Sequence, residues 1–341
     1  VLANLRLDEK RLPQDGRFML EASSERVSFR VSVLPIYHGE KVALRILRES
    51  LSGGFTLEAL GFHGAGLEHM HDAMRRTTGM VLTTGPTGAG KSTTLYTLLD
   101  IINTPSVNIS TIEDPIEYQM PRINQTQVKP DIGFTFANGL RSLVRQDPDI
   151  IMVGEIRDKE TANLAINAAL TGHLVLSTLH TNSAAGAIPR LIDMGVEPFL
   201  LVSTLRVVIG QRLVRKLCAK EERTLSRDET TRLEAIVDAG LVLKALKEEG
   251  VVQKTALWKN APFYIPKETT ECPDGYSGRI GIYEVLNMTE SIKQLVMAQG
   301  TTDDIHARAR KEGMISMAED GVFKAAQGIT TIEEVLRVVS E

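Results

Sequence analysis

The chain has 341 residues, which suggests roughly two or three domains of ordinary size. Its content of 43% apolar and 24% charged residues is typical of a globular protein. With 39 basic and 43 acidic residues the net charge is −4, so the overall charge does not favour nucleic acid, and no nucleic-acid partner is expected.

The cysteines, the apolar runs and the first residue add further expectations. No apolar run approaches the roughly 20 residues that cross a bilayer, and no signal peptide opens the sequence. Two cysteines far apart argue against a disulfide framework and for a reducing compartment. Because the sequence opens on Val1 with residues typical of the middle of a domain, we expect a fragment that lacks an N-terminal portion.

Residues 1–50 have the alternating pattern of β-strands. The expected strands, which have the branched and two-residue pattern of β structure, lie at 18–22, 27–33 and 41–47. Turn signals separate them at Asp15-Gly16, Ser23-Ser24 and His38-Gly39. We therefore expect a small sheet-bearing domain over residues 1–52, with a linker at 51–54.

From residue 57 to about residue 218, strands alternate with helices, which is the pattern of a parallel α/β sheet. The expected strands lie near 80–84, 107–112, 149–154 and 173–179, and a helix is expected over 159–170. Residues 219–265 indicate helices on a smaller appendage. Capped helices are expected at 289–297, 302–311 and 331–339.

A phosphate-binding pattern lies between the first of these strands and an unbroken helical run. It matches G-x-x-x-x-G-K-[ST] at every required position. Its members are Gly85, Pro86, Thr87, Gly88, Ala89, Gly90, Lys91, Ser92 and Thr93. The glycines let successive backbone N–H groups face the phosphates, at the positive end of the following helix. Lys91 is expected to reach the β- and γ-phosphates, and the Ser92 hydroxyl is expected to bind Mg²⁺. A plain glycine-rich turn is the alternative, but strand, loop and helix in register favour a nucleoside triphosphate site.

Acidic residues follow two other expected strands. Glu113, Asp114 and Glu117 end a β run that Pro115 turns, where a carboxylate can orient a water or support a metal ion. A solvated acidic loop is the alternative. The apolar run before Glu155 has the form of a Walker B element, whose acid contacts Mg²⁺ directly or through water.

Two arginines and two histidines are further candidates. Arg141 and Arg145 lie on one helical face and could clamp phosphate oxygens, or else pair with Asp147 or solvent. His173 and His180 bracket one strand, with a spacing that does not suit joint metal ligation from a single strand. Each histidine could sense the nucleotide, or could be a polar side chain that makes an ordinary hydrogen bond.

Taken in order, these blocks resemble the secretion ATPase superfamily, in the branch that powers type II secretion and type IV pilus assembly. The resemblance rests on GPTGAGKSTTLY, TIEDPIEY, LVRQDPDIIMVGEIRD and TGHLVLSTLHTN, and extends through DMGVEPFLL, QRLVRKLC and GYSGRIGIYEVL. The opening RLPQDGR, RVSVLP and GEKVALRIL resemble the second N-terminal domain of these ATPases. The resemblance covers nearly the whole chain.

The resemblance implies an α/β fold: a RecA-like P-loop ATPase core with a small N-terminal α/β (PAS-like) domain and a helical C-terminal appendage. The implied boundaries are 1–52 for the N-terminal domain and 53–217 for the core. A degenerate zinc-region appendage follows at 218–280, and a C-terminal helical segment at 281–341.

The resemblance also implies roles for single residues. Lys91 and Ser92 would bind phosphate and Mg²⁺, Glu155 would hold the metal, and Glu117, or Glu113 in its place, would polarise the attacking water. The residues implied to read or approach the nucleotide are His173, His180 and Arg279. In the family the N-terminal domain supplies arginines to a neighbour's nucleotide, and the matching candidates here are Arg30, Arg45 and Arg17, with surface strand arginines as the alternative.

The sequence departs from the family at its zinc region, where related ATPases often carry two CxxC pairs. Here Cys218 is followed three residues later by Glu221, and Thr269 stands three residues before Cys272, so each pair has lost one thiol. No histidine in residues 203–300 could replace the lost ligands. We expect no zinc, and an appendage held by packing or with two thiols near each other.

The expected function is ATP hydrolysis, with Mg²⁺, by a homohexameric motor for type IV pilus assembly or type II protein secretion. The implied partners are an inner-membrane platform protein and, through the missing N-terminal portion, a membrane-associated adaptor, with the chain in the bacterial cytoplasm at the inner membrane. A pilus retraction motor is the nearest alternative. A nucleic-acid translocase is less favoured because an aromatic content of 5% offers little stacking surface, and a GTPase-like switch because N-K-x-D is absent.

Overall fold

The computed structural model describes residues 2–3, 5–22, 25–48 and 56–340. The chain falls into two compact units, one of residues 1–55 with 115–121 and the other of residues 56–114 with 122–341. Among the described residues, no helix has the length and apolar character needed to span a membrane.

The first unit contains a three-stranded antiparallel sheet in the order β1-β2-β3. Its strands are β1 (Gln14–Ala22), β2 (Glu25–Ile36) and β3 (Gly39–Arg48). Phe18 stacks on Phe29 with ring centroids 4.9 Å apart, and Val31 and Val33 are buried beside them. The three predicted strands are confirmed, while the turn at Ser23-Ser24 and the linker at 51–54 lie outside the described residues. The described part of residues 2–48 carries these strands and no helix, so the expected α/β module is represented here by its sheet.

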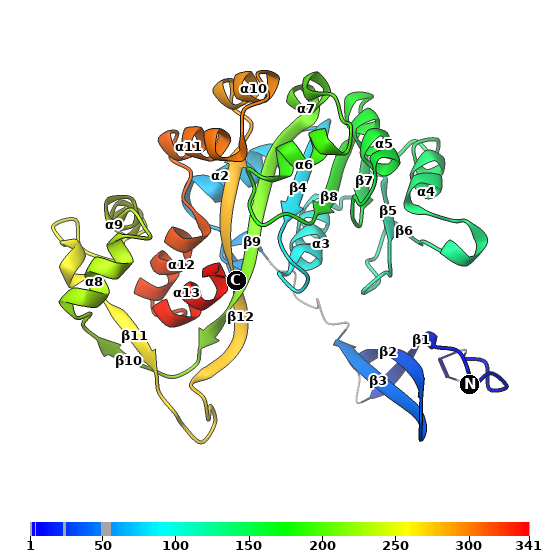
Figure 1. Ribbon diagram of the computed structural model, residues 1–341, viewed down its shortest axis with the longest axis horizontal. Helices are drawn as coiled ribbons and strands as arrows, with labels where there is room; N and C mark the ends of the chain where they lie inside the picture. The colour runs from blue at the N-terminus through cyan, green and yellow to red at the C-terminus, as the bar shows by residue number, and fades with distance from the viewer. Residues whose placement is uncertain (1, 4, 23–24, 49–55, 341) are drawn as a thin grey trace. The chain divides into compact units, whose positions relative to one another are not determined.

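The second unit is built on a seven-stranded sheet in the order β12-β9-β4-β8-β7-β5-β6 (Figure 1). The strands are β4 (Gly79–Thr84), β5 (Ile109–Glu113), β6 (Ile123–Gln127), β7 (Ile150–Val153), β8 (Leu174–Leu179), β9 (Leu205–Leu217) and β12 (Tyr276–Asn287). Neighbours pair in parallel, except that β12 runs antiparallel to β9. The four predicted strands are confirmed as β4, β5, β7 and β8. The carboxyl ends of the parallel strands therefore share one edge of the sheet.

Outside the appendage, which is described below, most helices of this unit begin after a polar residue or a glycine. They are α1 (Leu57–Leu60), α2 (Gly64–Met74), α3 (Lys91–Ile102), α4 (Phe136–Leu143), α5 (Lys159–Leu170), α6 (Ala187–Asp193), α7 (Pro198–Thr204), α10 (Glu290–Met297), α11 (Thr302–Lys311), α12 (Met317–Ala326) and α13 (Ile332–Ser340). The caps of α10 and α11 are Thr289 and Thr301, whose hydroxyls accept backbone N–H bonds. The predicted helices at 159–170, 289–297, 302–311 and 331–339 are confirmed as α5, α10, α11 and α13.

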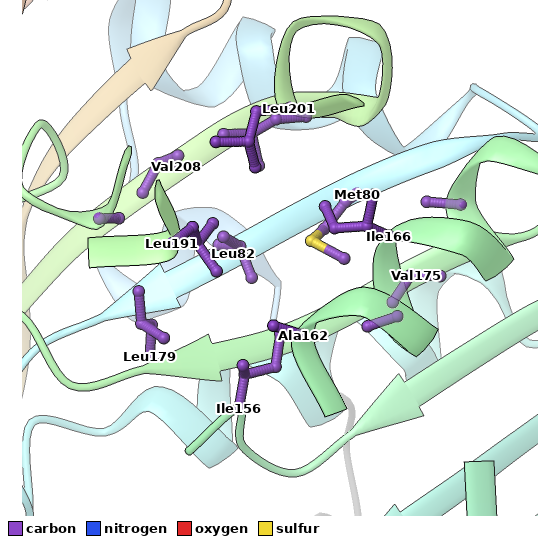
Figure 2. Close-up of a cluster of buried hydrophobic side chains, with 14 of the residues drawn as sticks. Met80, Leu82, Ile156, Ala162, Ile166, Val175, Leu179, Leu191, Leu201 and Val208 are labelled. Carbon is purple, nitrogen blue, oxygen red and sulfur yellow. The ribbon is translucent and has the colours of Figure 1, made fainter. Parts of the chain in front are cut away.

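An apolar core fills the space between the sheet and α5, α6 and α7 (Figure 2). Met80 and Leu82 of β4 point toward Ile166 of α5 and Leu191 of α6, and all four side chains are fully buried. Every residue of β4 is buried, so neither face of this strand meets solvent. This explains why its sequence contains consecutive apolar residues instead of alternating apolar with polar ones. This packing fixes the strand that leads into the phosphate-binding loop.

The appendage and helices α12 and α13 pack against the β9–β12 pair. The appendage contains β10 (Lys220–Arg223), α8 (Arg227–Glu234), α9 (Ala239–Glu248) and β11 (Phe263–Pro266). A second apolar cluster joins Leu246 of α9 and Val322 of α12 to Ile282 of β12. The boundary expected at residue 280 falls inside β12, because this strand belongs to the central sheet.

Cys218 and Cys272 are joined by a disulfide, with Cα atoms 6.6 Å apart and a sequence separation of 54. The sequence argued against a disulfide framework and allowed two neighbouring thiols; the structure brings the two cysteines together and joins them in this single bond. The antiparallel pairing of β9 with β12 places Leu217 opposite Tyr276, which brings the residue after β9 close to the loop before β12. Within the described residues, no group of three or more His, Cys, Asp or Glu side chains is arranged to hold a metal ion.

Candidate functional site

Residues 85–90 form a loop from the carboxyl end of β4 to the start of α3. Gly85, Gly88 and Gly90 have φ angles of +146°, +81° and +87°, which side chains disfavour. Gly90 is the N-cap of α3, so no side chain caps this helix. The N–H groups of the first turn are therefore available to an anion at the positive end of the helix.

Lys91 is the first residue of α3 and is 9% exposed. Its Nζ donates hydrogen bonds to the carbonyl oxygens of Gly85 at 2.7 Å and Pro86 at 2.9 Å. Burial lowers the pKa of Lys91, while the nearby charge of Glu155 acts in the opposite direction. The ammonium group thus folds back over the loop onto neutral carbonyls, and phosphate oxygens would be stronger acceptors for it.

Glu155 follows β7 at the same edge of the sheet, and its side chain is 13% exposed. One carboxylate oxygen lies 2.5 Å from Nη2 of Arg157, and the other lies 3.3 Å from Nε2 of His180. His180 follows β8, the strand between β7 and β4. Three neighbouring strand ends therefore bring together the lysine, the carboxylate and the histidine that the sequence singled out.

Glu113 ends β5 and is 3% exposed. Its carboxylate accepts hydrogen bonds from the hydroxyls of Tyr96 and Thr111, the latter at 2.5 Å, and from the side-chain amide of Gln125 at 3.1 Å. Tyr96 belongs to α3, so this carboxylate ties the helix of the phosphate-binding loop to β5. Tyr96 was part of a recognised block, but no sequence pattern assigned it this role.

Glu117 belongs to the first unit rather than to the sheet that carries Glu113. Arg17 of β1 donates hydrogen bonds to the backbone carbonyls of Ile116 at 2.5 Å and of Glu117 at 2.9 Å. These bonds hold the segment that carries Glu117 against the N-terminal sheet. Glu113 is therefore held through its carboxylate, by hydrogen bonds within the second unit, whereas the segment of Glu117 is held through backbone carbonyls, by Arg17 of the first unit.

Arg17, Arg30 and Arg45 form a row across the three strands of the first unit. Arg17 is paired with Arg30, and Arg30 is paired with Arg45. Residues that are directly opposite on neighbouring strands share a face, with Cβ atoms about 4.5–5.5 Å apart, and like charges in such pairs are destabilising. The structure thus collects all three N-terminal candidates on one face of the sheet, where their mutual repulsion would be relieved by an anion.

His173 lies at the opposite end of β8 from His180. Its backbone carbonyl accepts a hydrogen bond from Gly79 at the start of β4, and its Nδ1 lies 2.9 Å from the carbonyl oxygen of Ala168. A strand of this length separates its ends by roughly 20 Å at about 3.3 Å per residue. The expectation that His173 shares a site with His180 is therefore not met within one chain, and the alternative of an ordinary hydrogen bond describes it.

Arg141 and Arg145 lie at the end of α4, away from the phosphate-binding loop. Arg141 forms an exposed ion pair with Glu160 of α5, and Arg145 donates to the carbonyl oxygen of Arg141 at 2.6 Å. The segment after α4 is bound to Asn108 at the amino end of β5, which is the wrong edge of the sheet for the nucleotide. The expected phosphate clamp is not formed within this chain, and the ion pair involves Glu160 rather than Asp147.

Arg279 lies on β12 opposite Arg215 of β9. It is exposed, and its strand end shares the edge of the sheet that carries the phosphate-binding loop. The structure therefore leaves Arg279 at the candidate edge, unlike His173.

Two buried polar residues at this edge were missed by the sequence interpretation. Gln211 of β9 is 1% exposed and bonds to the phosphate-binding loop. Glu284 of β12 is 3% exposed and accepts a hydrogen bond from the backbone N–H of Ala184 at 2.6 Å, in the loop that follows His180. A local signal for each is a polar side chain next to an apolar run, residues 207–209 before Gln211 and residues 285–286 after Glu284.

The buried carboxyl group of Glu284 should make stability depend on pH. Burial raises the pKa of Glu284 above its ordinary value of 4.5, while the Ala184 N–H and the charges of Arg310 and Arg212 act in the opposite direction. The folded chain then binds this proton more tightly than the unfolded chain, so the free energy of unfolding falls as pH rises above 4.5 through the raised pKa. Glu284→Gln keeps an accepting oxygen but does not titrate. We expect the variant to have a larger free energy of unfolding than the unmutated chain above neutral pH, and the difference to shrink as the pH falls toward 4.5. A difference in unfolding free energy that stays the same at every pH would contradict this.

A cavity of about 400 Å³ lies elsewhere in the second unit. Its lining includes Phe62, Tyr283 and Asp320 together with Glu248 and Glu312, and it includes no residue of the phosphate-binding loop. Its acidic side chains do not suit a phosphate. We therefore locate the candidate site by the strand ends and not by this cavity.

Known proteins match the chain over its whole length. The family described as type II/IV secretion system protein matches residues 1–337. The type II secretion system protein E of Xanthomonas campestris pv. campestris is 49% identical over 344 residues, which cover 100% of this chain and 57% of the relative. The type IV pilus assembly ATPase PilB of Pseudomonas aeruginosa is 44% identical over 345 residues, again covering 100% of this chain and 57% of the relative. The chain thus spans a little over half the length of these two relatives.

Solved structures share the fold. The pilus retraction motor PilT with bound ADP is 28% identical, with a TM-score of 0.65, and the match covers 96% of this chain and 77% of that chain. The Legionella pneumophila ATPase DotB has a TM-score of 0.65 at 22% identity with the same coverage, which bears on the fold alone. The expected RecA-like core is confirmed by these neighbours and by the parallel sheet with its loop after β4. By its sequence, its fold and the order of its motifs, the chain belongs to the type II/IV secretion system protein family.

Proposed function

We propose that this chain hydrolyses ATP with Mg²⁺ as part of a homohexameric motor for type IV pilus assembly or type II protein secretion. The observation that carries the proposal is the meeting of Lys91, Glu155 and His180 at the carboxyl ends of β4, β7 and β8. A type II secretion system protein E and a type IV pilus assembly ATPase match this chain at 49% and 44% identity, so the proposal includes both secretion and pilus assembly.

The residues at this edge fit Mg²⁺. Ser92 is exposed at the start of α3 and offers a hydroxyl, and Glu155 offers a largely buried carboxylate; oxygen ligands of these kinds are the ones that Mg²⁺ prefers. Bound Mg²⁺ would neutralise charge on the β- and γ-phosphates. The loop N–H groups and Lys91 would bind the phosphate oxygens, and His180, in contact with Glu155, would respond to their state.

The proposed site is shared between subunits. The row of Arg17, Arg30 and Arg45 would reach the nucleotide of a neighbouring chain, where guanidinium groups stabilise the charge of the transition state. The proposed partners are an inner-membrane platform protein and a membrane-associated adaptor. We place this activity in the bacterial cytoplasm, at the inner membrane.

The direct test measures phosphate release from ATP by the purified chain over a range of protein concentrations, with Mg²⁺ and with a chelator. We expect turnover that requires Mg²⁺ and rises steeply with protein concentration as the hexamer forms. A monomer with full activity would contradict the proposal that the nucleotide site is shared between subunits. Turnover that depends strongly on added DNA would favour the nucleic-acid translocase instead.

Glu117→Gln is expected to lower the rate of hydrolysis about 100-fold, the usual effect of losing a group that takes a proton from water. Nucleotide affinity should stay close to that of the unmutated chain, because the phosphate-binding loop is untouched. Glu40→Gln, which makes the same change at an exposed acid of β3 in the same unit, is the matched control.

Glu113→Gln separates the two candidate acids. Because its carboxylate accepts bonds from Tyr96, Thr111 and Gln125, we expect this change to lower stability first. If Glu113→Gln instead left stability intact and stopped turnover while Glu117→Gln was fully active, the role of the base would pass to Glu113.

A further inference from the structure

Gln211 bridges the two parts of the phosphate-binding element from the neighbouring strand. Its Nε2 donates to the carbonyl oxygen of Ala89 at 2.8 Å, within the loop. Its Oε1 accepts from the hydroxyl of Thr94 at 2.9 Å, in the first turn of α3. Because the side chain is 1% exposed, water does not compete for either bond.

The bond to Ala89 sets the direction of the next amide. In a planar trans peptide, the C=O of one residue and the N–H of the following residue point in opposite directions. The Ala89 carbonyl faces Gln211 of β9, so the N–H of Gly90 faces away from β9. A loop of this kind binds phosphate through such backbone N–H groups.

Packing around Gln211 supports the same conclusion. A Cβ on Gly85 would collide with the backbone carbonyl of Gln211, and a Cβ on Gly90 would lie 2.9 Å from its Nε2. The two glycines that the sequence pattern requires therefore leave room for Gln211 as well as for a ligand. The Thr94 bond at the other end keeps the amide of Gln211 from rotating its donor away from the loop.

We propose that Gln211 is a positioning residue for the nucleoside phosphate, which acts by fixing the Ala89–Gly90 peptide in the orientation that binds it. The proposal rests on the proposed function, since it concerns the same nucleotide site. It adds that β9, and not only β4 and α3, determines the affinity of the loop.

The test measures equilibrium binding of a fluorescent ADP analogue to the full chain, without hydrolysis. Gln211→Leu removes both bonds at similar volume, and Gln211→Glu keeps an acceptor for Thr94 but cannot donate to Ala89. Both variants should bind the analogue about tenfold more weakly, the usual scale for leaving a buried partner unsatisfied. Thr94→Val, which releases the far end of the bridge and leaves the bond to Ala89 in place, should have a smaller effect.

A double-mutant cycle and a matched control separate positioning from general stability. Once Gln211 is Leu, Thr94→Val should cause no further loss of affinity, because the two residues act through one bridge. Thr204→Val removes a bond of 2.7 Å from an equally buried hydroxyl in α7, away from the loop, and should lower the unfolding midpoint without changing affinity.

Two outcomes would overturn the proposal: unchanged affinity in Gln211→Leu, or a loss that Thr204→Val reproduces at equal destabilisation. Failure of the proposed function looks different, because the unmutated chain itself would then bind no ADP analogue.

Discussion

Lys91→Ala is expected to reduce ATP turnover about 1,000-fold or more, since removing a single positioned donor to the developing charge already costs 10²–10³. The structure gives the physical reason. Lys91 is buried at the start of α3, and its ammonium group is held over the loop by the carbonyls of Gly85 and Pro86. Alanine leaves the loop N–H groups in place but removes the only charge that the pattern brings to the β- and γ-phosphates. Steady-state phosphate release measures the effect.

The control for this variant is Lys254→Ala, which removes an exposed lysine of the appendage and should leave turnover unchanged. Circular dichroism should show that Lys91→Ala stays folded, because burial already lowers the pKa of this lysine and the folded chain gains little from its charge. Normal turnover in a folded Lys91→Ala variant would mean that hydrolysis does not take place at this loop.

The strands that sequence predicted are those whose burial is visible locally. β4, β7 and β8 are buried at every position, so each appears as a short apolar run bounded by turn residues or by an acid. β9 and β12 were missed because their ends are exposed and carry charges such as Arg215 and Arg279. β6 was missed because it is a polar edge strand, Ile123–Gln127. What defines these three strands is their pairing with distant segments, which local patterns do not contain.

The same distinction holds for the site. Gly85–Thr93 and Glu155 were found because each pattern is contiguous and follows a predicted strand. His173 was expected, like His180, to read the nucleotide, yet the two residues lie at the two ends of β8 and so at opposite edges of the sheet. Gln211 reaches the site through the pairing of β9 with β4, and Glu284 through the pairing of β12 with β9, so the role of each depends on register.

Register also explains the arginine row. Arg30 and Arg45 lie in stretches that match the family and Arg17 is a further candidate, but only the pairing of β1, β2 and β3 places the three directly opposite one another. A shift of one residue in either hairpin would turn one of them to the other face. The gathering of like charges is thus a property of the fold that the sequence alone did not supply.

The double variant Arg30→Ala, Arg45→Ala is expected to lower turnover about 1,000-fold, the lower end of the effect of an arginine supplied to a transition state. Nucleotide binding should change little, because the loop, Lys91 and Gln211 are intact. Lys41→Ala is the matched control, since Lys41 is an exposed cation on β3 with the same strand parity as Arg45. It should retain full turnover.

Mixing two inactive variants decides whether these arginines act on a neighbouring chain. Lys91→Ala chains have an intact arginine row, and the Arg30→Ala, Arg45→Ala chains have an intact phosphate-binding loop. In a mixed ring, some interfaces pair an intact row with an intact loop, so a fraction of the turnover should return on mixing and increase with the proportion of such interfaces. If the arginines served their own chain, neither variant would contain a complete site and mixing would restore nothing. Recovery on mixing would therefore establish the nucleotide site as one assembled from two subunits.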